Sequence, residues 1–156
     1  MKSPHVYDKA KYHHNTVAEH NLPHEHAFHH TAVFLRWLIE NRLMSDFFEE
    51  EQKEDLNKFR IGKISILEIY SWWDGCLVDD MLSKEGNAFA LYYFDFKQGR
   101  YIHDYIAALK GSLPTEFHVK YTNENYQIMQ KTIDRKDKEW KKPKWSWWPF
   151  RKKDGA

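Results

Sequence analysis

PHEHAFHHTAVFLRWLIENRL, residues 23–43, is the stretch that decides the fold. Its apolar side chains recur every three or four positions, which places them along one face of an α-helix. Pro23 suits the first turn of that helix, because a residue there needs no backbone N–H donor. The residues on this face are Ala27, Phe28, Thr31, Phe34, Leu35, Leu38 and Ile39. We therefore expect a helix over about residues 23–43, the best defined in the chain.

The segments that follow also carry helix signals. Ser45 is a typical N-cap for a second helix, whose carboxylates near its N-terminus complement the helix dipole. Gly62 is expected to end that helix. Residues 63–73 then give a further amphipathic pattern. It ends at Asp74-Gly75, since Asp bonds to nearby backbone and Gly accepts a positive φ.

In the middle of the chain, the spacing of the apolar residues does not decide between helix and strand. Residues 77–82 predict a short helical turn, and Ser83 can cap a segment that runs to Tyr93. The run LYYFDF at residues 91–96 is rich in residues that favour strands, so it fits a strand as well as a helix. Both interpretations remain open from the sequence.

The C-terminal third is expected to be largely helical. Residues 101–110 predict a helix that Gly111 stops, and residues 115–121 alternate like a short strand. Residues 122–141 predict a long final helix, which Pro143 ends.

The sum is a mainly α fold, a single compact helical domain with at most a short strand pair. We expect three parts: an N-terminal arm over residues 1–22, a helical globular domain over 23–142, and a basic, Trp-rich tail over 143–156. Hydrophobic residues make up 42% of the 156, which argues against disorder over most of the length.

Composition also narrows the functional classes. The single cysteine, Cys76, excludes an internal disulfide and a cysteine-rich zinc site. No stretch reaches the roughly 18 apolar residues of a membrane span, and the N-terminus lacks the apolar segment of a secretory signal. A cytoplasmic protein without a membrane span is therefore the expectation.

Charge is unevenly distributed along the chain. Residues 131–156 carry ten Lys/Arg against four Asp/Glu, whereas residues 1–130 carry fourteen against nineteen. A mildly acidic body thus ends in a basic tail. The acidic residues are densest at Asp46, Glu49, Glu50, Glu51, Glu54 and Asp55.

Eight of the ten histidines lie in the first thirty residues. His26 and His30 stand four apart on the strongest helix, a spacing that can hold zinc, and His24 or His29 could join them. The HExxH metalloprotease pattern is absent, because Ala27 follows His26. Solvated or hydrogen-bonded histidines are the commoner explanation, so no metal ligand and no cofactor are assigned.

The run Trp72-Trp73-Asp74-Gly75 is a second candidate. A catalytic Asp74 would need a partner such as His103 or His118, and nothing in the spacing fixes that geometry. Cys76 has acidic neighbours that disfavour a thiolate nucleophile. We expect a structural Asp and a buried Trp, and no catalytic residue is assigned.

Short motifs spread over residues 7–141 match a known pattern. They are Tyr12-His13, Leu22-Pro23, His30-Thr31 with Phe34-Leu35 and Trp37, Trp73-Asp74-Gly75, Glu85-Gly86-Asn87 with Phe89-Ala90, Tyr92-Tyr93, Asp104-Tyr105, His118-Val119 and Asn125-Tyr126. In these motifs the chain resembles a family of small bacterial proteins known only as a domain of unknown function. The family pattern places polar residues at His13, His30 and Asp74. In size and composition such families resemble the immunity proteins that protect bacteria from antibacterial effectors.

The expected function is therefore that of an immunity protein, not of an enzyme. It would bind a cognate toxin protein, of the secreted polymorphic, Rhs or type VI kind, and occlude its active site. Acidic residues would steer the encounter and exposed aromatic residues would anchor the complex. The expected partner-binding residues are Glu49, Glu50, Glu51, Glu54, Asp55, Trp72, Asp74 and Tyr101. The oligomeric state is left open.

Two other functions remain open from the sequence. One is a metal-binding protein or enzyme that uses His13, His26, His30 and Asp74. The other is an adaptor for nucleic acid or a membrane surface, because the tail interleaves Lys/Arg with tryptophans that can stack on bases or lie at a lipid interface. A tail that folds back onto the body is the commoner arrangement for such a segment.

Overall fold

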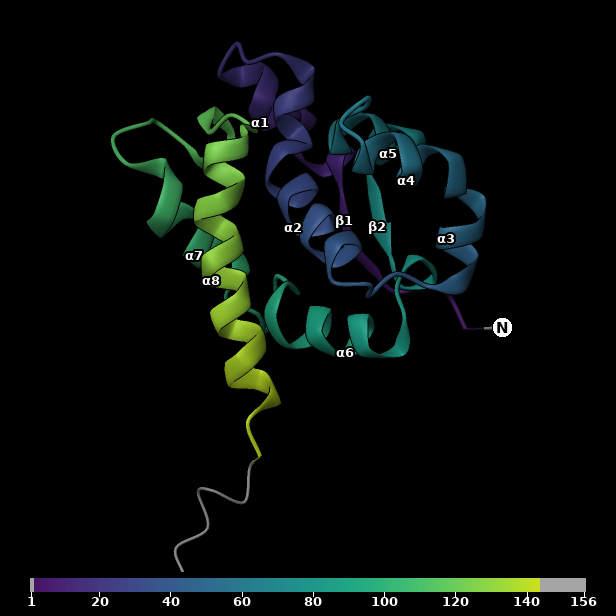
Figure 1. Ribbon diagram of the computed structural model, residues 1–156. Coiled ribbons are helices and arrows are strands. Elements are labelled where there is room, and N and C mark those ends of the chain that lie inside the picture. Colours follow the sequence, from purple (N-terminus) through teal and green to yellow (C-terminus); the bar gives the residue numbers. More distant parts are fainter. Residues whose placement is uncertain (1, 144–156) are drawn as a thin grey trace, which may run out of the picture.

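The computed structural model describes residues 2–143, and its centre is helix α2 (His29–Glu40), as Figure 1 shows. Every residue of α2 except Arg36 and Glu40 is buried, as expected for a helix that is apolar around most of its circumference. The predicted helix over 23–43 is thus confirmed in type. Its first turn, η2 (His24–Ala27), is a 3-10 turn.

The remaining described helices surround α2 and confirm the mainly α fold. The α-helices are α1 (His14–Glu19), α3 (Asp46–Glu51), α4 (Lys53–Arg60), α5 (Ile66–Trp72), α6 (Lys84–Tyr93), α7 (Tyr101–Tyr105) and α8 (Asn123–Lys141). The short turns are the 3-10 segments η1 (Ala10–His13), η3 (Asp79–Met81) and η5 (Glu116–His118), and the π-helical segment η4 (Ile106–Lys110).

Side-chain caps explain why several helices begin where the sequence predicts. The hydroxyl of Ser45 accepts the backbone N–H of Phe48 at 3.1 Å, and that of Ser83 accepts the N–H of Gly86 at 3.0 Å. Ser65 begins α5 with a capping box. Each such cap satisfies a backbone donor that the helix leaves free and is worth about 1 kcal/mol. Because Ser83 caps α6, the ambiguous run at 91–96 begins as the end of a helix and not as a strand.

The turn after α5 leads the chain into the small sheet. Asp74 and Gly75 both have positive φ, 55° and 62°. A side chain at Gly75 would place its Cβ atom 2.4 Å from Phe28 Cε1 and 2.7 Å from Ala10 Cβ, so only glycine fits this close approach. The predicted end of the helix at this pair is confirmed.

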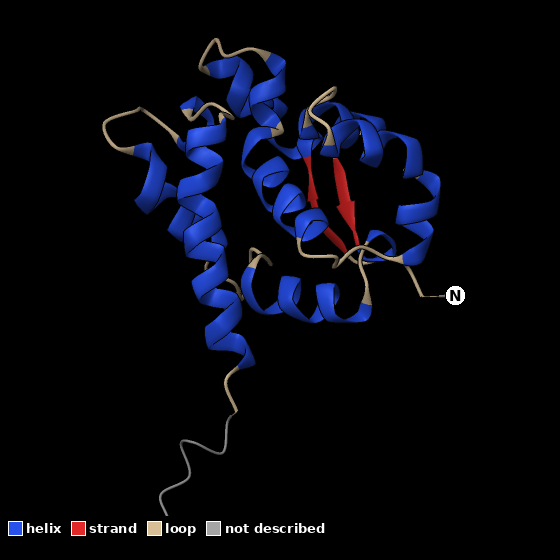
Figure 2. Cartoon of the chain, viewed as in Figure 1, coloured by secondary structure: helices blue, strands red, loops and turns tan. Residues whose placement is uncertain are grey.

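Two short strands form an antiparallel sheet, which Figure 2 shows between α2 and α3 in this view. β1 (Val6–Lys9) pairs with β2 (Cys76–Val78), with Asp8 opposite Leu77 and an irregularity between Val6 and Asp8. The sequence predicted an extended arm over residues 1–22 and a helical turn at 77–82. In the structure, residues 6–19 instead form β1, η1 and α1, and they contribute buried side chains such as Tyr7 and Val17.

The predicted strand at 115–121 is wrong. Residues 116–118 form a 3-10 turn, which the hydroxyl of Thr115 caps by accepting the N–H of Phe117 at 3.2 Å. Phe117 and Val119 are buried, so the alternation in the sequence reports which side chains face inward and not a sheet.

The core is built from aromatic rings. The ring of Phe34 on α2 lies 4.6 Å from that of Phe94 and 5.3 Å from that of Tyr101, measured between centroids. Phe89 packs against Trp37 at 5.1 Å. Tyr101, which the sequence analysis expected as an exposed anchor, is fully buried, and its hydroxyl donates a hydrogen bond to the backbone carbonyl of His30. It therefore stabilises the core.

Within residues 2–143, no helix combines the length and the apolar character that a membrane span requires. The predicted tail over 143–156 lies outside the described residues, apart from Pro143.

Candidate functional site

A polar cluster lies in the interior between β1 and α2. The carboxylate of Asp8, which is 1% exposed, accepts a hydrogen bond from the hydroxyl of Thr31 at 2.5 Å. His13 Nε2 lies 2.8 Å from one carboxylate oxygen, Oδ1, and His30 Nε2 lies 3.2 Å from the other, Oδ2. We name Asp8, His13, His30 and Thr31 the Asp8 cluster.

Three elements bring the Asp8 cluster together. Asp8 sits on β1, which β2 holds in place, and the N–H of Ala10 just beyond the strand donates to the carbonyl of Gly75 at 2.8 Å. The chain then turns through η1, which ends at His13. His30 and Thr31 come from the first turn of α2. The position of Asp8 in the cluster therefore depends on the pairing of β1 with β2.

Electrostatics keep Asp8 ionised. Its burial alone would raise the pKa of the carboxyl group, but the hydrogen bonds and the positive charge that His13 and His30 offer hold this pKa well below its usual range. At neutral pH the cluster is thus a buried carboxylate held between two imidazoles.

Aromatic rings form the walls around the two imidazoles. The Phe117 ring centroid lies 5.3 Å from that of His13 and 5.7 Å from that of His30. The Phe96 ring lies 6.4 Å from both imidazoles. Only His13 reaches solvent to any extent, with 17% of its side chain exposed, compared with 3% for His30. The cluster is therefore shielded from solvent on most sides, and its exposed edge is the side chain of His13.

His26 and His30, the pair that the sequence suggested as metal ligands, do not share a site in the structure. His26 Nδ1 lies 2.5 Å from the backbone carbonyl oxygen of Phe117, whereas His30 faces Asp8. Among the described residues, Asp8, His13 and His30 form the one group with metal-ligand spacing. Asp74 is exposed at the turn after α5 and is not a member of that group.

His29 gives a prediction for the pH dependence of stability. Its burial lowers the pKa of the imidazole from 6.5 to about 4, although a hydrogen bond to the Val119 carbonyl acts in the opposite direction. The folded state therefore favours neutral His29, so its contribution is complete above pH 6.5 and is lost as the pH falls towards 4. We expect the free energy of unfolding, measured with urea, to fall over this range.

The variant His29→Gln isolates this effect, because glutamine stays neutral at every pH in the range. Its free energy of unfolding should fall less steeply between pH 6.5 and 4 than that of the unmodified chain. Equal slopes for the two chains would contradict the assignment to His29. Both chains contain Asp8, so its contribution to the pH dependence is the same in the two slopes.

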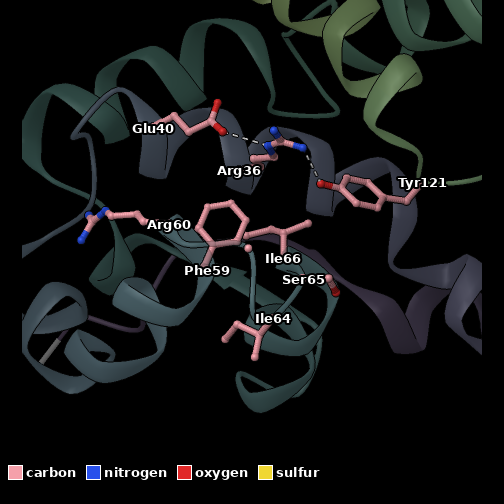
Figure 3. Close-up of a pocket in the computed structure, with 9 residues that line it drawn as sticks. Arg36, Glu40, Phe59, Arg60, Ile64, Ser65, Ile66 and Tyr121 are labelled. Atoms are coloured by element: carbon pink, nitrogen blue, oxygen red, sulfur yellow. Dashed lines mark hydrogen bonds and ion pairs between the residues drawn. The ribbon is translucent and has the colours of Figure 1, made fainter.

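Figure 3 shows a cavity of about 390 Å³ lined by residues of α2, α4 and α5 and by Tyr121. Arg36 donates to Glu40 at 2.9 Å and to the hydroxyl of Tyr121 at 2.9 Å. Its guanidinium also lies over the ring of Tyr126, 3.7 Å from the centroid. These partners tie α2 to the start of α8, so we interpret Arg36 as a structural cation at the wall of the cavity.

The acidic residues predicted to bind a partner lie on α3 and α4. Two of them are paired within the chain, Glu49 with Arg60 and Asp55 with Lys58, each at 3.6 Å. Within residues 2–143, no salt bridge holds the exposed carboxylates of the other three, Glu50, Glu51 and Glu54, or that of the neighbouring Asp46.

Two large aromatic side chains on α3 and α5 are also exposed. Trp72 at the end of α5 is 52% exposed, and Phe47 on α3 is 54% exposed. Trp73, which follows α5, packs against α3. Its ring centroid lies 6.0 Å from that of Phe47 and 5.2 Å from that of Phe48. We name the resulting region the acidic–aromatic surface, and its members are Asp46, Phe47, Glu50, Glu51, Glu54 and Trp72.

Sequence reasoning missed Phe47 and Asp8. The Phe47-Phe48 pair at the start of a helix was a usable signal, because adjacent residues on a helix cannot both face the core. In the structure Phe48 is the buried one. Asp8 offered no comparable signal, since its four-residue strand pairs with residues about seventy positions away.

Comparison with family models places the chain in a family. Residues 6–119 match the model of the domain of unknown function DUF7832, and the chain belongs to that family. This agrees with the resemblance to a domain family of unknown function. The matched region includes both the Asp8 cluster and the acidic–aromatic surface. Searches of curated proteins and of solved structures gave no significant match.

Proposed function

We propose that this member of the DUF7832 family is an immunity protein, which binds a cognate antibacterial toxin in the cytoplasm and occludes its active site. The toxin would be an effector of the secreted polymorphic, Rhs or type VI kind, with basic residues around its catalytic centre. The protein would act stoichiometrically, one molecule for each toxin molecule.

The observation that carries the proposal is the acidic–aromatic surface. Its four carboxylates have no salt-bridge partner among residues 2–143, so their negative field is available to a basic partner. Such a field increases the rate of encounter and sets the orientation of the complex. Phe47 and Trp72 supply apolar area of the kind that dominates binding energy at interfaces.

The surface is also held rigidly, which favours binding. Phe48 and Leu56, the core residues of α3 and α4, are fully buried. Ser45 caps α3, and Ser65 begins α5 with a capping box. Because the backbone is ordered before the partner arrives, little conformational entropy is lost on association.

Charge reversal tests the proposal. The triple variant Glu50→Lys, Glu51→Lys, Glu54→Lys should no longer protect cells that co-express the toxin of the neighbouring gene. We expect its association rate with that toxin to fall by about 10- to 1,000-fold at low salt, since steering by opposite charge is lost. Survival of the cells and the association rate of the purified proteins are the two measurements.

A matched control reverses the charge of three glutamates elsewhere on the protein. The triple variant Glu19→Lys, Glu25→Lys, Glu124→Lys alters three exposed carboxylates on α1, η2 and α8. It should protect as well as the unmodified chain. Protection that both variants lose to the same degree, or that neither loses, would count against this surface. A toxin that kills equally with and without the unmodified chain would remove the proposal itself.

A further inference from the structure

We propose that the Asp8 cluster binds one divalent transition-metal ion, with Asp8, His13 and His30 as the protein ligands. This site is separate from the acidic–aromatic surface, and the inference does not depend on the proposed function. The converging donor atoms, their chemistry, unpartnered polar atoms beside them and the exposed edge of His13 all favour an ion at this site.

The donor atoms already converge. One carboxylate oxygen of Asp8 and one ring nitrogen of each histidine all lie within 4.8 Å of one another. In a tetrahedral zinc site with bonds of about 2.0–2.1 Å, neighbouring ligand atoms lie roughly 3.3 Å apart. His13 Nε2 lies 2.8 Å from one oxygen of Asp8, Oδ1, and His30 Nε2 lies 3.2 Å from the other, Oδ2. Without an ion, the two imidazoles thus lie at hydrogen-bond distance from the carboxylate, one on each oxygen. To hold the ion, ligand atoms that lie up to 4.8 Å apart must come closer together by up to about 1.5 Å, which rotation of the side chains can supply.

The chemistry of these donors selects the class of ion. Imidazole nitrogens suit Zn²⁺ and its first-row neighbours, whereas Mg²⁺ and Ca²⁺ prefer oxygen donors throughout. The carboxylate of Asp8 supplies the negative charge that a buried dication requires. Three protein ligands also leave a coordination position for water, as in zinc sites that are not purely structural.

Unpartnered polar atoms lie beside the cluster. Among the described residues, His30 Nδ1 has no hydrogen-bond partner, although the side chain is 97% buried. The hydroxyl of Tyr70 is also buried without a well-formed hydrogen bond, and the Thr31 hydroxyl beside it is already used by Asp8. The Tyr70 phenol is close enough to Asp8 that the carboxylate adds to the effect of burial in raising its pKa. Buried polar atoms without partners are rare, and a metal-bound water would give this phenol one.

The site reaches solvent at His13, whose side chain is 17% exposed. A cavity of about 280 Å³ has Tyr12 and Phe96 among its lining residues, although no member of the Asp8 cluster lines it. Tyr12 is the neighbour of His13 in η1, and the Phe96 ring lies 6.4 Å from both imidazoles. Asp95, which lies 3.4 Å from His5, and Lys97 also line this cavity.

Zinc titration of the chelator-treated full chain tests the inference. We expect one equivalent of Zn²⁺ to bind, and Co²⁺ in its place to give the intense visible absorption of a four- or five-coordinate site. The variant His13→Gln should bind Zn²⁺ at least about 100-fold more weakly, because even the loss of a residue that only supports a ligand costs 10- to 100-fold. It should also lose the Co²⁺ absorption. His13 is chosen because it is the most exposed ligand, so its replacement disturbs the core least.

The variant His24→Gln is the matched control. His24 is exposed and lies outside the Asp8 cluster, with its ring tilted against that of His14 at 3.9 Å between centroids. It should bind Zn²⁺ and Co²⁺ as the unmodified chain does. The inference is overturned if the unmodified chain binds no stoichiometric zinc, if a His13→Gln variant that unfolds cooperatively in urea binds it equally well, or if His24→Gln abolishes binding. None of these results would bear on protection against a toxin.

Discussion

Replacing Asp8 with alanine is expected to lower the free energy of unfolding by about 3–5 kcal/mol. The carboxylate is buried and meets His13, His30 and Thr31 at 2.5–3.2 Å. Removing it leaves the Thr31 hydroxyl and the buried His30 imidazole without their partner, and an unsatisfied buried polar group carries its full desolvation penalty. Urea unfolding of metal-free protein at pH 7 measures the effect.

The variant Asp80→Ala is the control for the loss of an aspartate. Asp80 is exposed in η3, and the change should alter the free energy of unfolding by no more than about 0.5 kcal/mol. If Asp8→Ala were equally mild, the cluster would not hold β1 to α2.

Replacing Phe34 with alanine should be comparably severe, at about 3–5 kcal/mol, because it removes a fully buried ring from the densest part of the core. The ring stacks on Phe94 at 4.6 Å and contacts Tyr101 at 5.3 Å. Both neighbours are fixed by other contacts, so they cannot close the cavity. Urea unfolding again gives the measurement.

The matched control is Phe47→Ala on the acidic–aromatic surface. Phe47 is 54% exposed, so its loss should change stability by no more than about 0.5 kcal/mol. Under the proposed function, the same variant should weaken binding to the toxin. A Phe47→Ala variant as unstable as Phe34→Ala would show that Phe47 belongs to the core and not to a binding surface.

Local chemistry made the helices predictable from the sequence. The apolar period of three to four residues identified α2, and serine caps located the starts of α3 and α6. The Asp74-Gly75 turn was predictable because a positive φ at the end of a helix favours glycine. These signals lie within a few residues of the element they determine.

The strands and the Asp8 cluster depend on contacts between distant residues, which no local pattern encodes. β1 has four residues and acquires its partner only when β2 follows α5. His13 and His30 were noted as polar positions of the family pattern, but the carboxylate that joins them was not. Exposure is equally hard to read from the sequence, since Tyr101 is as aromatic as Trp72 and yet is buried.

The two proposed sites are formed by different parts of the structure. The acidic–aromatic surface is formed by α3, α4 and the end of α5, whereas the metal ligands come from β1, η1 and α2. Protection against a toxin without metal binding, or metal binding without protection, would each leave one proposal standing.

Titration of a candidate toxin, encoded by a neighbouring gene, with the purified protein tests the proposed function most directly. A blocking immunity protein predicts that toxin activity falls in proportion to the amount added and reaches zero at one equivalent. The charge-reversed variant with Lys at positions 50, 51 and 54 should leave that activity intact. Undiminished activity at every ratio, or complete inactivation by a small fraction of an equivalent, would contradict stoichiometric occlusion.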